Sequence, residues 1–291
     1  MKILLLGKAG QVGGALTPLL RQLAGSSAGE AVVTLGRADV DLSDAAALAQ
    51  AVQRVQPSLI VNAAAHTAVD RAETESEVAF AINAVAPGVL AAQAAKLNAL
   101  LVHYSTDYVF DGSQRTPYRE SDPTHPLGVY GESKLAGEQA VEASGCRHLL
   151  LRTSWVYDST GRNFLTTMLR LAKQHGKLRV VGDQHGSPTS AALIAEATVH
   201  LIRCALDQPD LAGGLYHLTA QGQTTWHGFA QAIMRKAGLD IPIEAITTAD
   251  YPTPAKRPAY SVLNCGKLQT QFNYRLPDWQ QALDALTGLR P

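Results

Sequence analysis

Apolar and polar positions form two repeating patterns in the first half of the chain. Short runs that are apolar nearly throughout alternate with longer stretches rich in alanine and leucine. The short runs are typical of strands buried on both faces, and the longer stretches are typical of helices that cover such strands. The predicted strands are 2–7, 31–36, 59–64, 100–105 and 148–155, and the predicted helices are 11–24, 43–55, 75–97 and 131–144.

This alternation predicts an α/β protein with a doubly wound parallel sheet, which is a Rossmann fold. The rhythm loosens after Trp155, and we interpret the rest as a smaller lobe. We expect a first domain over 1–160, an interleaved lobe over 161–291, and segments near 180–225 that return to the first domain. Helices are expected in this second half at 163–175, 190–206 and 226–238, with a last one beginning near Asp278.

Composition narrows the classes of function. The 291 residues are 46% hydrophobic and 17% charged, and the formal net charge is zero. Without a basic stripe, nucleic acid is not an expected partner. Three distant cysteines fit a reducing, cytoplasmic setting. The apolar run at the start is broken by Gly7, so we expect a buried strand there and no membrane association.

A glycine loop follows the first predicted strand. The stretch GKAGQVGG holds Gly7, Gly10 and Gly13 between that strand and a predicted helix. Glycine permits the tight turn and the close approach of a diphosphate, and the helix directs free N–H groups toward it. This placement predicts a dinucleotide site in the domain over 1–160. The alternative is a glycine-rich turn without a ligand.

Arg37 bears on the choice of cofactor. A site that prefers NAD usually carries Asp or Glu at the end of the second strand, to bond the ribose 2′-hydroxyl. Here that strand ends in Gly36 and Arg37. A guanidinium suits a 2′-phosphate through forked, charge-assisted hydrogen bonds, so we expect NADPH, with NADH as the alternative. The other interpretation of Arg37 is a solvated surface residue.

Candidate chemistry gathers after the fourth strand. A helix that begins near Tyr130 places Tyr130 and Lys134 on one face, because they are four residues apart. A nearby ammonium lowers the pKa of a phenol, which can then exchange a proton near neutral pH. A hydroxyl at the strand end can hold a substrate oxygen. Ser105 and Thr106 both fit this role, and strand periodicity leaves the choice between them open.

Taken together, these motifs resemble the extended short-chain dehydrogenases/reductases, and within them the dTDP-4-dehydrorhamnose reductase family. The resemblance spans nearly the whole chain. It rests on GKAGQVGG, VNAAAHTAVDRAE, HYSTDYVFDG, VYGESKLAGE, LRTSWVY, NFLTTMLRLAK, DQHGSPT, GLYHLTA with TTWHGFA, and YPTPAKRP.

The resemblance implies a reaction and its residues. Members reduce the 4-keto group of dTDP-4-dehydro-L-rhamnose with NADPH or NADH. Tyr130 would protonate the oxygen, and Lys134 would lower the tyrosine pKa and bond the nicotinamide ribose. The catalytic hydroxyl of the family maps to Thr106, and Asp107 and Trp155 map to sugar contacts.

Further positions are assigned by the same mapping. Residues implied to line the cofactor are Gly10, Gln11, Val12, Asp41, Leu42, Ala65, His66, Thr67 and Tyr104. Arg257 lies in the proline-rich loop. It either reaches a nucleotide phosphate or is a solvated surface arginine, and the sequence favours the two interpretations equally.

One family feature is missing. Some members join as dimers through a metal held by acidic residues, but the corresponding neighbourhoods here contain Ala15 and Ala192. We therefore expect no metal and no Mg²⁺-bridged dimer, and leave a homodimer open.

Two alternative functions need weighing. A nucleotide-sugar dehydratase or epimerase shares the fold, but dehydratases carry Thr-Asp-Glu where this chain reads Thr106-Asp107-Tyr108. A tyrosine cannot replace the carboxylate that eliminates water. A regulatory subunit of methionine adenosyltransferase resembles the same branch and acts only by binding. The intact set of Thr106, Tyr130 and Lys134 favours an enzyme.

Overall fold

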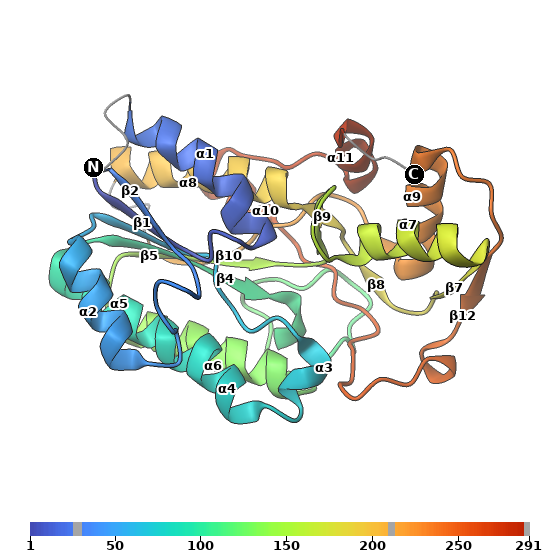
Figure 1. Cartoon of the computed structure of the whole chain (residues 1–291), viewed down its shortest axis with the longest axis horizontal. Coiled ribbons are helices and arrows are strands. Elements are labelled where there is room, and N and C mark those ends of the chain that lie inside the picture. The colour runs from blue at the N-terminus through green and yellow to red at the C-terminus, as the bar shows by residue number, and fades with distance from the viewer. Residues whose placement is uncertain (26–30, 209–212, 288–291) are drawn as a thin grey trace.

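A six-stranded parallel sheet forms the centre of the protein (Figure 1). The computed structural model describes residues 1–25, 31–208 and 213–287. The strand order is β10-β5-β4-β3-β1-β2, with every neighbouring pair parallel. The strands are β1 (Ile3–Leu6), β2 (Val32–Leu35), β3 (Leu59–Asn62), β4 (Leu100–Thr106), β5 (His148–Thr153) and β10 (Gly214–His217).

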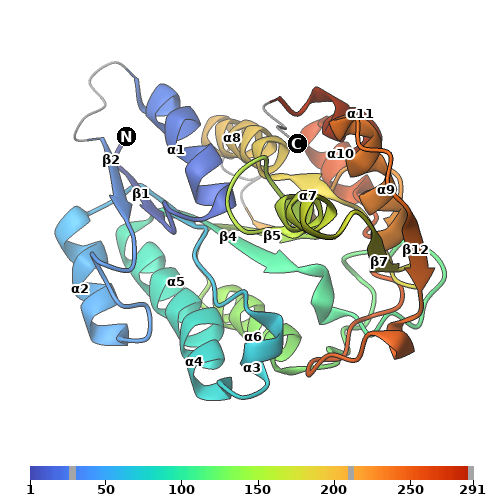
Figure 2. The same ribbon diagram turned by 45° about the vertical axis from the view of Figure 1, so that its right-hand side comes forward.

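Helices cover both faces of this sheet, which confirms the predicted doubly wound α/β class (Figures 1 and 2). Alternate residues of each strand enter opposite cores, as the two-residue period of a strand requires. Leu5 of β1 packs with the helices of one face, and Leu4 with those of the other. The first face carries α1 (Gln11–Ala24) and α8 (Ala191–Asp207), and the second carries α2 (Ala45–Val55), α5 (Ala86–Leu97) and α6 (Val129–Ala143).

The helical run from Ser76 to Leu97 comprises three elements. Helix α4 (Ser76–Phe80) leads into a π-helical turn, η1 (Ala81–Val85), and then into α5. Within the described part of the chain, this is the one helix long and apolar enough to cross a membrane, with a mean hydropathy of 1.6. We had not expected a segment of that kind. It lies in the helical layer beside α2 and α6, so its composition also suits a core helix (Figure 2).

A second apolar core lies beyond the sheet. Helices α7 (Phe164–His175), α9 (Trp226–Ala237) and α11 (Trp279–Ala285) pack around it, with β7 (Leu178–Val181) paired to β12 (Ile243–Ile246). The elements α8 and β10 lie between these segments in the chain but pack with the central sheet, since β10 pairs with β5 and α8 packs on α1. The predicted boundary between residues 160 and 161 stays a prediction. The remaining short elements are α3 (Val69–Ala72), η2 (Asp107–Val109), β6 (Val156–Tyr157), β8 (His185–Gly186), β9 (Thr189–Ser190), β11 (Thr224–Thr225), η4 (Thr248–Asp250) and α10 (Gly266–Phe272).

Candidate active site

The glycine loop packs tightly against the end of β3. Gly7 adopts φ 86°, and a side chain there would place its Cβ 2.7 Å from the backbone of Ala63. A Cβ on Gly13 would lie 2.1 Å from the carbonyl oxygen of Gly7. Both positions therefore require glycine. They lie where the chain leaves β1 for α1, beside β3, at the point where the strand order reverses and α/β proteins bind ligands.

The N-terminus of α1 suits a diphosphate group. Its N-cap residue, Gly10, is exposed and offers no side chain to the free N–H groups of the first turn. No acidic residue lies in that turn. The side-chain oxygen of Gln11 is buried without a partner among the described residues, and Val12 is half-buried. Free N–H groups and the helix dipole favour an anion here, so these residues fit a dinucleotide cofactor.

Beyond β2, the polar groups are arranged differently from our expectation. Arg37 is exposed, and two residues further along lies the carboxylate of Asp39, which the sequence did not lead us to expect at this site. Asp39 accepts hydrogen bonds from the backbone N–H of Gly36 at 2.7 Å and from Nζ of Lys8 at 2.9 Å. The Lys8 hydrogen bond holds the pKa of Asp39 below its usual value. The end of β2 thus carries two cations, with one carboxylate already engaged.

Asp41 and Leu42 follow in the same loop. The Asp41 carboxylate accepts hydrogen bonds from the backbone N–H and hydroxyl of Ser43, at 2.9 and 2.7 Å, so it stabilises its own turn. Leu42 is half-buried and packs on the core that contains α2.

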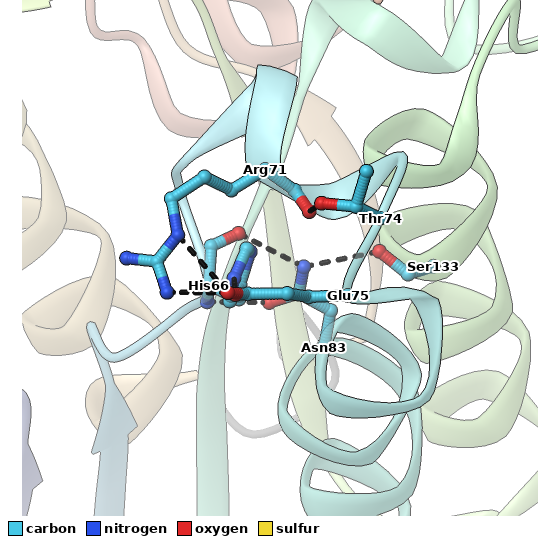
Figure 3. A network of polar contacts seen from close by, with 6 residues as sticks. All are labelled: His66, Arg71, Thr74, Glu75, Asn83 and Ser133. Carbon is cyan, nitrogen blue, oxygen red and sulfur yellow. Dashed lines mark hydrogen bonds and ion pairs between the residues drawn. The ribbon is translucent and has the colours of Figure 1, made fainter.

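The segment Ala65–Thr67 follows β3 and is held by a polar network (Figure 3). Asn83 of η1 accepts from the N–H of His66 at 2.8 Å and donates to its carbonyl oxygen at 3.1 Å. The Asn83 amide also donates to the hydroxyl of Ser133 in α6, at 3.0 Å. On the ring of His66, Nε2 lies 3.3 Å from Glu75, while Nδ1 is buried without a partner among the described residues. Ala65 is half-buried and Thr67 exposed.

Thr106 and Tyr130 meet at the end of β4. The Thr106 hydroxyl donates to Asp107 at 3.1 Å and accepts from the N–H of Tyr108 at 3.2 Å. Burial raises the pKa of Tyr130 to about 12, although a hydrogen bond with Thr106 lowers it. Tyr130 is therefore protonated at neutral pH and able to donate. The neighbouring hydroxyl of Ser105 is buried, with no partner among the described residues.

Lys134 is buried one turn after Tyr130. Its Nζ donates to the carbonyl oxygen of Tyr104 at 2.5 Å and lies 3.3 Å from Nε2 of His103. Burial lowers the pKa of Lys134 to about 8, against the charge of Glu138, which raises it. The phenol of Tyr104 points away, to a 2.7 Å hydrogen bond with Thr198 of α8, so its backbone rather than its side chain meets the lysine.

Asp107, expected to contact the sugar, is a buried carboxylate. Burial raises its pKa to about 7, while hydrogen bonds from Ser261 and Thr106 lower it. One of its carboxylate oxygens has no partner among the described residues. Trp155, the other predicted sugar contact, adopts a left-handed backbone (φ 47°) and stacks on Trp226 with ring centroids 3.5 Å apart. One face of the indole is thus covered by the first residue of α9.

Arg257 comes near the site from the proline-rich loop. Its guanidinium bonds Asp70 of α3 at 2.9 Å and also contacts Thr253. A pocket beside this loop is lined by Val69, Glu73, Tyr108, Leu127, Gly128, Tyr130, Gly131, Ala255, Lys256 and Pro258. Arg257 is therefore partly satisfied within the chain.

Sequence reasoning missed several residues that shape this site, and it missed the contact that Tyr108 makes. The ring of Tyr108 meets that of Tyr130 edge to face at 5.6 Å. Glu73 accepts from the N–H of Val129 at 3.0 Å and so caps α6, whose N-cap Gly128 has no side chain. Asn83 lies in a stretch that carries no catalytic motif, and His103 begins HYSTDYVFDG without a role that the motif assigns, so only their contacts distinguish them.

A Rossmann fold with this glycine loop and a Tyr–Lys helix defines a protein of the short-chain dehydrogenase/reductase class. Sequence comparison is more specific. The chain belongs to the family described as RmlD substrate binding domain, which matches residues 1–288. Among the described residues, no group of three or more His, Cys, Asp or Glu side chains is arranged to hold a metal ion.

The chain is similar to proteins named dTDP-4-dehydrorhamnose reductase. It is 49% identical to the one from Escherichia coli K12 over 96% of this chain and 95% of that protein, and 46% identical to the one from Burkholderia thailandensis over 97% of each. A crystal structure of the Bacillus anthracis enzyme in complex with NADP is 32% identical and covers 98% of each chain, with a TM-score of 0.89. The Clostridium acetobutylicum structure has the same score at 37% identity, covering 98% of this chain and 97% of that one.

Proposed function

We propose that this chain is an NAD(P)H-dependent oxidoreductase that reduces the 4-keto group of dTDP-4-dehydro-L-rhamnose to give dTDP-L-rhamnose. The observation that carries the proposal is the buried, protonated Tyr130 beside Thr106 at the end of β4, in a chain 49% identical to a protein of that name. The reaction needs a hydride, a proton and a group that holds the ketone oxygen. Bound NADPH supplies the hydride, and the side chains supply the rest.

Three residues carry the proton chemistry. Tyr130 donates its proton to the ketone oxygen as that oxygen gains charge. The Thr106 hydroxyl turns its hydrogen from Asp107 to the same oxygen, while the N–H of Tyr108 holds the Thr106 oxygen in place. Lys134, on the same helix face, lowers the pKa of Tyr130 as the phenolate forms and offers an N–H to the nicotinamide ribose.

The surrounding residues bind the two ligands. Asp107 and Trp155 contact the sugar, and Arg257 reaches toward the nucleotide phosphates from its bond to Asp70. Arg37 favours NADPH, with NADH as the alternative. The cofactor site is completed by Gly7, Gly10, Gln11, Val12, Gly13, Asp41, Leu42, Ala65, His66, Thr67 and the backbone of Tyr104.

The substrate and the cofactor are both cytoplasmic metabolites, so we place the activity in the cytoplasm. A homodimer is compatible with this function and is not needed for it, since Thr106, Tyr130 and Lys134 all come from one chain.

Isotope transfer tests the reaction against its alternatives. With NADPH deuterated on the transferred face, we expect dTDP-L-rhamnose that carries deuterium at C4, as shown by mass and NMR spectra. A dehydratase or epimerase returns its hydride and gives no net oxidation of the cofactor. A purely regulatory protein would bind NADPH and release the keto sugar unchanged. Either outcome would overturn the proposal.

A further inference from the structure

A row of buried polar groups beneath the site connects β3, β4 and α6. The backbone N–H of Ala64 donates to Oδ1 of Asn62 at 3.2 Å. The Nδ2 of Asn62 lies 3.1 Å from Nδ1 of His103, its register partner on β4. The Nε2 of His103 lies 3.3 Å from Nζ of Lys134. Asn62 and His103 are each 1% exposed and Lys134 is 2% exposed, so the groups must satisfy one another.

The hydrogen bond from Ala64 to Asn62 determines which atom donates and which accepts at each later contact in the row. Only the oxygen of the Asn62 amide can accept from the Ala64 N–H, so the amide nitrogen faces His103 and donates to Nδ1. A neutral imidazole whose Nδ1 accepts carries its hydrogen on Nε2. A doubly protonated ring would set two donors against each other at Nδ1. The Nε2–H of His103 therefore points at Lys134.

Lys134 must accept at this contact. An ammonium has three hydrogens and no lone pair, whereas a neutral amine has one lone pair and two hydrogens. One of those hydrogens is used by the carbonyl oxygen of Tyr104 at 2.5 Å. We propose that His103 is a positioning residue that donates from Nε2–H to Lys134 and so favours the neutral amine of Lys134 in the cofactor-free enzyme.

The charge of Glu138 opposes this state, because it raises the pKa of Lys134. Glu138, one turn further along α6, forms two hydrogen bonds with the guanidinium of Arg152, at 2.8 and 2.6 Å, and both side chains are 3% exposed. Its charge is thus largely compensated. Tyr130 is protonated, and burial raises the pKa of Asp107 to about 7. Burial also lowers the pKa of His103, which keeps its ring neutral.

The consequence for catalysis rests on the proposed function. When Tyr130 gives its proton to the ketone oxygen, a phenolate is left on the face that carries Lys134. Its negative charge favours the ammonium, so Lys134 takes up one proton from water as Tyr130 loses one. The two groups then titrate as a pair. His103 sets how readily Lys134 becomes charged, and so keeps the tyrosine protonated until substrate is in place.

Two spectra of the cofactor-free wild-type protein test the proposal. Long-range ¹H–¹⁵N correlations of the histidine rings, with His103 assigned by its loss in His103→Gln, should show the hydrogen on Nε2. The ¹³Cε shift of Lys134, assigned with Lys134→Met, should titrate at least one pH unit below the exposed Lys256 and at a lower pH than in His103→Phe, because burial alone also lowers this midpoint. A hydrogen on Nδ1, or a lysine midpoint that is unchanged in His103→Phe, would overturn the proposal. Neither readout needs the keto sugar, so failure here differs from failure of the proposed function.

An isosteric variant reverses the donor and acceptor roles along this row of hydrogen bonds. In Asn62→Asp the new carboxylate accepts from Nδ1–H, so Nε2 becomes an acceptor and the midpoint of Lys134 should rise by at least one unit, a tenfold change in its charged-to-neutral ratio. The added charge alone also raises it, so the same change is made in a His103→Phe background. We expect a smaller rise there, and equal rises would contradict a relay through the imidazole. The wild-type spectra decide the question even where a variant folds poorly.

Discussion

The buried carboxylate of Asp107 shows how one residue can serve a site at a cost to stability. The pKa of this group is raised to about 7 in the folded chain. Between about pH 4 and pH 7 the folded state therefore binds more protons than the unfolded state, and stability falls as pH rises. A neutral amide of the same shape avoids this cost.

We therefore expect Asp107→Asn to raise the free energy of unfolding at pH 8 by up to about 3 kcal/mol, and with it the melting temperature. At pH 4 the melting temperature should be nearly unchanged. Thermal unfolding at the two pH values measures the difference. The exposed Asp240→Asn is the control and should show no such gain. A gain of equal size at both pH values would contradict a raised pKa.

The proposed preference for NADPH rests on Arg37. Removing a charge-assisted bond to the 2′-phosphate should weaken NADPH binding roughly tenfold or more and leave NADH binding nearly unchanged. Fluorescence titration of Arg37→Ala with both cofactors measures this. Arg21→Ala, an exposed arginine at the end of α1, is the matched control. An equal loss for both cofactors would show that Arg37 contacts no 2′-phosphate.

At the scale of elements, the π-helical turn η1 joins the cofactor end to the chemical end of the site. Asn83 from this turn holds the backbone of His66 and the hydroxyl of Ser133. That hydroxyl in turn donates to the carbonyl oxygen of Tyr130 at 2.9 Å. The loop after β3 and the first turn of α6 are thus fixed to one amide.

Asn83→Ala should therefore lower both stability and turnover. Leaving these buried groups unpaired costs about 1–3 kcal/mol. Gln93→Ala is a matched control, because Gln93 is another buried amide on the same helical run, bonded to Gln53 at 3.4 Å. Chemical denaturation and kcat should separate the two, since only Asn83→Ala displaces Tyr130. A normal kcat in Asn83→Ala would show that the network does not position the site.

At the scale of the whole molecule, periodicity predicted five of the six strands of the sheet and the helices that cover it, and it missed β10. Buried parallel strands such as β1 and β3 are apolar on both faces, so their signal is strong. The strands β7 and β12 are short and half-exposed, and their pairing joins segments more than sixty residues apart, which no local pattern shows.

The residues of the site likewise divide into those that local spacing predicts and those that only the fold brings together. Motifs around Gly7 and Tyr130 predict the glycine loop and the catalytic helix, because each depends on local spacing. Asn62 and His103 are ordinary strand residues until register places them side by side. Asp39 accepts hydrogen bonds from Lys8 and from the N–H of Gly36, and these contacts likewise appear only in the folded loop.

The central claim is that Tyr130 delivers the proton for ketone reduction. The most direct measurement is the loss of NADPH absorbance on adding dTDP-4-dehydro-L-rhamnose to the wild type and to Tyr130→Phe, with NADPH affinity measured in parallel. We expect oxidation by the wild type only when the keto sugar is present, and a variant that binds NADPH normally but turns over at least about 100-fold more slowly. Full activity of Tyr130→Phe would contradict the account.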